Sequence, residues 1–156
     1  MKIYIMLLLS IISFSACANK NAFDDFNITK KQALSVEQIQ SSKMKNANSV
    51  TGIVTALYLN NVDKKEFHGD EYFYVSLFIQ GSKSEDIQFL LNSKKPLQVK
   101  TLTNTNRFTK LTSLNAAWLK YYLVTFNKVE GNLKLQIKDN NNSSRLLLFK
   151  NLELIK

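Results

Sequence analysis

The sequence predicts a mainly β domain, an antiparallel β-sandwich, which follows an N-terminal leader and a polar tether. Roughly seven short runs rich in β-branched and aromatic residues follow Asn48, and turn-forming residues separate them. After Leu59 we find no amphipathic stretch that would supply the crossover helices of a parallel sheet. Hydrophobic residues make up 45% of the chain, which is enough for one core. We therefore expect a single folded domain over residues 49–156.

The first strands are predicted by two strongly apolar runs. Val50 to Leu59 is rich in β-branched residues and ends at an Asn-Asn turn signal. Tyr72 to Ile79 is apolar at nearly every position, which is typical of a strand buried on both faces. Further strands are expected at residues 87–91, 97–102, 121–126, 133–138, 145–149 and 152–155.

The candidate core is best defined near the C-terminal half. Apolar side chains alternate with polar ones at Leu133, Leu135 and Ile137, so these three should face the core. Trp118, with Tyr121 or Tyr122, is expected to anchor the core beside a long connection over residues 104–117. For these aromatic residues packing is favoured over ligand binding.

The strand spacing favours an immunoglobulin-like or transthyretin-like sandwich. Residues 17–48 are polar and contain few strand-forming runs, so they are expected to form a partly helical tether. Thr29 with Gln32 matches the spacing of a helix capping box. The alternative is a tether with no regular structure.

The leader has the organisation of an export signal. Lys2 supplies a positive charge and Ile3 to Ile12 supplies an apolar run. The run is shorter than the roughly 20 residues that cross a bilayer as a helix. Residues 1–16 are therefore expected to be removed as a signal peptide.

Phe14-Ser15-Ala16-Cys17 resembles the lipobox of bacterial lipoproteins, with Phe14 in place of the usual leucine. The resemblance implies that Cys17 becomes an acylated N-terminus that attaches the chain to a membrane. Because Ala18 follows the cysteine, the resemblance also implies the outer membrane. We expect the domain to face the periplasm. The alternative is an ordinary signal peptide with a chance cysteine.

The chain contains few residues of the kinds that catalysis and metal binding use. His68 is the only histidine and Cys17 the only cysteine, and no Gly-x-Ser-x-Gly motif accompanies them. Acidic residues gather with His68 in the segment from Asp63 to Glu71, but their spacing matches neither a calcium loop nor a zinc site. We therefore expect no metal, no cofactor and no enzymatic activity, and we interpret this segment as a solvated loop.

Charge and glycosylation motifs are the remaining signals. The net charge is +9, but the lysines are scattered and no nucleic-acid-binding motif appears, so no nucleic-acid partner is expected. Residues 25–29 and 139–143 resemble the extended acceptor of bacterial N-glycosylation, which implies Asn27 and Asn141 as possible sites. Chance in an asparagine-rich chain is the alternative.

These observations lead to one expected function and two alternatives. The leading expectation is a non-catalytic envelope lipoprotein that binds or supports another envelope protein through a sheet edge or the Asp63–Glu71 loop. The second is binding of a lipid or glycan in an apolar cleft lined by Phe78, Tyr122 and Trp118. The third is an envelope hydrolase that uses His68 or two acidic residues that converge in a cleft.

Overall fold

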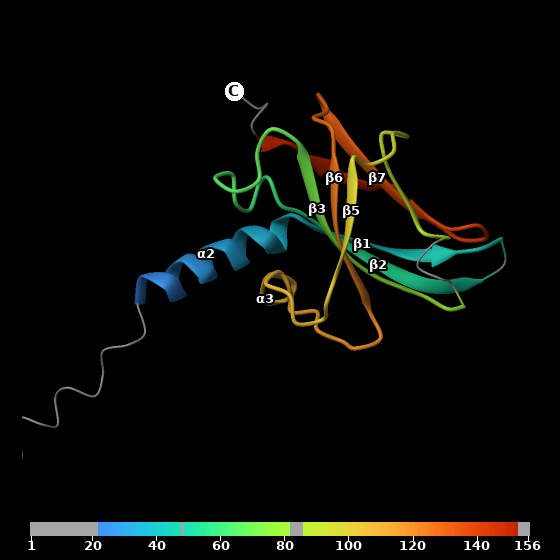
Figure 1. The fold of residues 1–156 in the computed structure, drawn as a ribbon, viewed down its shortest axis with the longest axis horizontal. Coiled ribbons are helices and arrows are strands. Elements are labelled where there is room, and N and C mark those ends of the chain that lie inside the picture. Colours follow the sequence, from blue (N-terminus) through green and yellow to red (C-terminus); the bar gives the residue numbers. More distant parts are fainter. Residues whose placement is uncertain (1–21, 48, 82–85, 153–156) are drawn as a thin grey trace, which may run out of the picture. The chain divides into compact units, whose positions relative to one another are not determined.

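The computed structural model describes residues 22–47, 49–81 and 86–152, with side chains from residue 30 onwards. Contacts divide the chain into residues 1–30 and 31–156, and the sheet belongs to the second unit. The helices are α2 (Ala22–Glu37) and α3 (Thr109–Thr112). The strands are β1 (Ile39–Lys45), β2 (Val50–Tyr58), β3 (Glu71–Ile79), β4 (Gln88–Leu91), β5 (Gln98–Leu102), β6 (Lys120–Phe126), β7 (Asn132–Lys138), β8 (Ser143–Ser144) and β9 (Leu147–Lys150) (Figure 1).

All the described strands belong to one antiparallel sheet that curls into a half-barrel. Its order is β4-β7-β8-β1-β2-β3-β6-β5, and β9 also pairs with β7. The mainly β, antiparallel fold predicted from the sequence is confirmed. The described strands form a continuous sheet, and an immunoglobulin-like or transthyretin-like sandwich is not confirmed.

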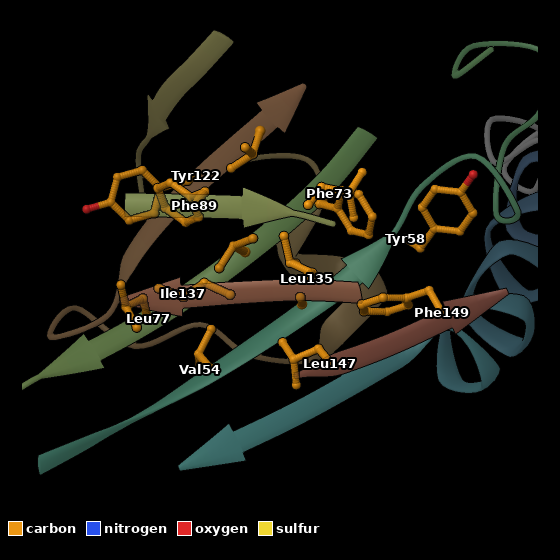
Figure 2. Packing of buried hydrophobic residues seen from close by; sticks show 14 of the residues in the cluster. Val54, Tyr58, Phe73, Leu77, Phe89, Tyr122, Leu135, Ile137, Leu147 and Phe149 are labelled. Carbon is orange, nitrogen blue, oxygen red and sulfur yellow. The ribbon is translucent and has the colours of Figure 1, made fainter. Parts of the chain in front are cut away.

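The main core fills the concave inner face of the sheet (Figure 2). Leu133, Leu135 and Ile137 are fully buried there, as their alternation predicts. The curl brings distant strands together: the rings of Phe73 in β3 and Phe149 in β9 lie 5.2 Å apart between centroids. This ring contact packs β9 against β3 across the core.

A second, smaller cluster covers one end of the outer face. Tyr74 and Tyr121 lie on this face and pack with Phe108 from the segment before α3. The backbone amide of Ala116 donates to Tyr121 Oη at 2.8 Å, which fixes the long connection to β6. Ser35 Oγ, near the end of α2, donates to the carbonyl of Leu111 at 2.7 Å.

The folded part begins earlier in the chain than the sequence predicts. Residues 17–48 were expected to form a partly helical tether, with the domain starting at Ser49, and α2 supplies the helix. However, β1 begins at Ile39 and pairs along its length with β2, in the middle of the sheet. A run such as Gln40-Ser41-Ser42-Lys43 has almost no apolar alternation, so neighbouring strands rather than propensity determine this strand.

The C-terminal strands also differ in detail. The segment expected to be a polar turn, residues 139–144, ends in the two-residue strand β8. The next strand, expected from Arg145, begins at Leu147. Most of the last expected strand, over residues 152–155, lies outside the described residues.

Candidate functional site

The structure describes the predicted lipid-attachment site and the two predicted glycosylation sites to different extents. Cys17 and the whole leader lie outside the described residues. Asn27 lies within α2, in the part described by its backbone alone. Asn141 is exposed in the turn between β7 and β8. In the described part of the chain, no helix has the length and apolarity needed to cross a membrane.

Two acidic side chains of the Asp63–Glu71 loop form separate ion pairs. Asp63 forms an ion pair with Lys31, and Glu66 forms one with Arg107. His68 is exposed. Within residues 22–47, 49–81 and 86–152, no three His, Cys, Asp or Glu side chains come together as a possible metal site.

Asp63 is a carboxylate of this loop whose pKa is shifted by its surroundings. Burial disfavours its charged form. The ion pair with Lys31 and the nearby amides of the turn outweigh this effect, so the pKa of Asp63 lies below its ordinary value. This arrangement keeps the Asp63 carboxylate charged and fastens the loop to α2.

Glu71 is buried at the start of β3, where its carboxylate links neighbouring segments of the chain. Its Oε2 accepts a hydrogen bond from Tyr58 Oη at 2.5 Å. Its Oε1 accepts from the backbone amide of Val129 at 3.1 Å. The carboxylate thus ties β2, β3 and the segment after β6 to one another.

The expected cleft between Phe78, Tyr122 and Trp118 does not form. Tyr122 lies on the inner face, where its ring packs against Phe89 with centroids 5.2 Å apart. Phe78 points to the other face of the sheet, because it alternates with the inner residue Leu77. Trp118 is 63% exposed, so its expected role as a core anchor is wrong.

The first surface of interest is the open side of the half-barrel, between its two edge strands. β4 pairs on one side with β7, and β5 pairs on one side with β6, so these strands end the sheet. Side chains from both edges line a hollow of about 250 Å³, which we call the seam. Its lining is mostly apolar: Ile87, Phe89, Leu90, Pro96 and Val99, with Gln88 and Lys95.

The second surface is a line of exposed residues across the outer face. Cross-strand pairing places Lys43 of β1 opposite Ile53 of β2, and Ile53 opposite Phe78 of β3. Trp118 continues the line, since its ring meets Phe78 edge-to-face with centroids 5.5 Å apart. We call Lys43, Ile53, Phe78 and Trp118 the outer row.

A basic hollow adjoins the cationic end of the outer row. It measures about 380 Å³, and its lining includes Lys43, Lys45 and Arg145 but no acidic residue. The Ser42 hydroxyl accepts from the Arg145 amide at 3.0 Å and donates to the Lys43 carbonyl at 3.2 Å. This hydroxyl fastens the segment between β8 and β9 to β1, so the three cations are held near one another.

Sequence reasoning found neither the seam nor the outer row. The seam depends on which strands end the sheet, and strand order leaves little mark in the sequence. The outer row had one visible signal, since Phe78 and Trp118 are large apolar residues, but both were assigned to the interior. Comparisons with protein-family models, with curated proteins and with solved structures find no match to this chain.

Proposed function

We propose that this chain is an exported, non-catalytic module that is anchored by lipidated Cys17 at the outer membrane, faces the periplasm and binds another envelope protein. The lipobox-like residues 14–17 and the short apolar leader support the anchoring part of the proposal. Acyl chains contribute roughly 0.8 kcal/mol of membrane affinity per buried methylene, so several would hold the protein firmly.

The observation that carries the binding part is the open side of the sheet. Edge strands present unpaired backbone N–H and C=O groups that can pair with a strand of another protein. Here β4 and β5 are both edges, and the apolar seam lies between them. A partner strand that pairs with β5 would place alternate side chains in the seam.

The composition of β5 suits this use. Every residue from Gln98 to Thr101 is exposed, and Val99 remains 43% exposed although it is apolar. Lys100 lies in the middle of the strand, and a charge in an edge strand discourages pairing between identical copies. In this proposal the domain is an immunoglobulin-like or transthyretin-like sandwich that is incomplete on its open side. A strand of the partner protein completes it there.

Site-specific crosslinking in cells tests the proposal. A photo-crosslinking amino acid at Thr101 in β5 should capture one defined envelope protein. The control position is Lys134, which is exposed but lies in β7, a strand paired with both β4 and β9. Absence of a defined product from Thr101, or the same product from Lys134, would refute binding at the edge.

A further inference from the structure

The outer row combines exposed apolar rings with an adjoining group of cations. Ile53 in β2 is 44% exposed, Phe78 in β3 is 38% exposed, and Trp118 in the turn before β6 is 63% exposed. Neighbouring strands are about 4.8 Å apart, so residues paired across β1, β2 and β3 form a nearly continuous strip. The strip is rigid because each position belongs to a paired strand or to a fixed turn.

Trp118 is held in place although it is exposed. The amide of Leu119 donates to the carbonyl of Ala116 at 3.1 Å, which closes a turn around Trp118. Tyr121 Oη accepts from the Ala116 amide and fastens this turn to β6. The tryptophan therefore projects from a fixed turn, and its ring and that of Phe78 meet edge-to-face.

The charged end of the outer row has one sign. Lys43 belongs to the row, and Lys45 and Arg145 line the hollow beside it. The ion pairs of Lys31 with Asp63 and of Arg107 with Glu66 involve none of these three cations. Cations brought together without a carboxylate favour an anionic ligand.

We propose that the outer row docks the domain on the headgroup region of a membrane that contains anionic phospholipids. Tryptophan and phenylalanine suit this region because their rings occupy the boundary between headgroups and acyl chains. Lys43, Lys45 and Arg145 meet the lipid phosphates, and the stems of the two lysines lie along the apolar boundary. The inference does not depend on the proposed function or on acylation of Cys17.

The natural probe is Trp118, the only tryptophan in the chain. The full-length chain with Cys17→Ser would be mixed with vesicles of phosphatidylcholine, with and without phosphatidylglycerol. Trp118 emission should shift to shorter wavelength with the anionic vesicles, and lipids brominated on their acyl chains should quench it. The apolar leader can also bind vesicles, but Trp118 reports on the outer row itself.

Variants separate the contributions of charge and apolar contact. Each unit of positive charge near an anionic surface increases partitioning onto the vesicles roughly fivefold. Lys43→Glu removes one positive charge and adds one negative charge, so it should weaken partitioning by about thirtyfold. Lys100→Glu changes the net charge equally but lies in β5, and it should change partitioning by less than about twofold. Phe78→Ser should reduce the quenching of Trp118, whereas Leu97→Ser, at an exposed apolar residue outside the row, should not.

Three results would overturn the inference. One is unchanged Trp118 emission with anionic vesicles while circular dichroism shows a folded chain. Another is the same shift with soluble glycerol phosphate, which would assign the cations to a free phosphate compound. The third is a shift that depends on protein concentration without vesicles, which would assign the outer row to a second copy of the chain.

Discussion

The buried hydrogen bond between Tyr58 and Glu71 allows a quantitative test of how the sheet is held together. Glu71 is only 1% exposed and Tyr58 is fully buried, so water cannot replace either partner. Hydrogen bonds to a charged group contribute about 1.5–3 kcal/mol. We expect Tyr58→Phe to lower the free energy of unfolding by about 2 kcal/mol.

Removing the carboxylate should cost more than removing the hydroxyl. Glu71→Ala removes the acceptor of two hydrogen bonds, the buried one from Tyr58 Oη and the part-buried one from the Val129 amide. Hydrogen bonds to a carboxylate contribute about 1.5–3 kcal/mol each, so the expected loss is about 4 kcal/mol. Glu71→Gln keeps the shape and one acceptor oxygen, and it should cost about 1–2 kcal/mol.

Equilibrium unfolding in urea, followed by far-ultraviolet circular dichroism, measures these changes. A double-mutant cycle of Tyr58→Phe and Glu71→Gln should give a coupling energy of about 1–2 kcal/mol. Tyr72→Phe is the matched control, since Tyr72 is half-buried on the outer side of the same region and should change stability by less than about 0.5 kcal/mol. A coupling energy near zero would refute the assigned role of the Glu71 carboxylate.

Three further predictions concern other parts of the chain. Gly52→Ala should destabilise the fold by about 3 kcal/mol or more, measured by urea unfolding, because the new Cβ would lie 2.0 Å from the backbone oxygen of Phe78. Asp63 has a lowered pKa in the folded state, so its contribution is present above the ordinary value of 3.8 and is lost as the pH falls through the folded pKa. The stability difference between wild type and Asp63→Asn should therefore shrink on acidification, and a difference that grows would contradict the ion pair with Lys31. Cys17→Ser should abolish incorporation of labelled palmitate and release the chain from membranes, and continued labelling would disprove the lipobox assignment.

Much of the sheet could be predicted because its strands carry clear local patterns. β7 alternates polar and apolar residues, and β2, β3 and β6 are rich in β-branched and aromatic residues. β1 could not be predicted in this way. Its stability comes from pairing with β2 and β8, and these contacts are fixed by topology rather than by its own residues.

The exposed aromatic residues show a second limit of sequence reasoning. Tyr74 and Phe78 occupy the same face of β3, and nothing in their local sequence distinguishes them. Phe108, which belongs to the long connection, packs on Tyr74 and covers it. At the other end of this face Phe78 remains 38% exposed. The path of that connection decides which ring is buried. The seam and the outer row could therefore be found only after the chain path was known.

The central position of β1 has a consequence for folding. β1 has β2 on one side, which follows it closely in sequence, and β8 on the other, which comes almost a hundred residues later. The hairpins can form early, but the sheet is complete only when the C-terminal strands return to β1 and bring Leu147 and Phe149 into the core. Closing so long a loop is slow. We therefore expect the return of the last strands, rather than any hairpin, to limit the rate of folding, and a chain that ends before Ser143 to leave both β1 and β7 open to pairing with other molecules.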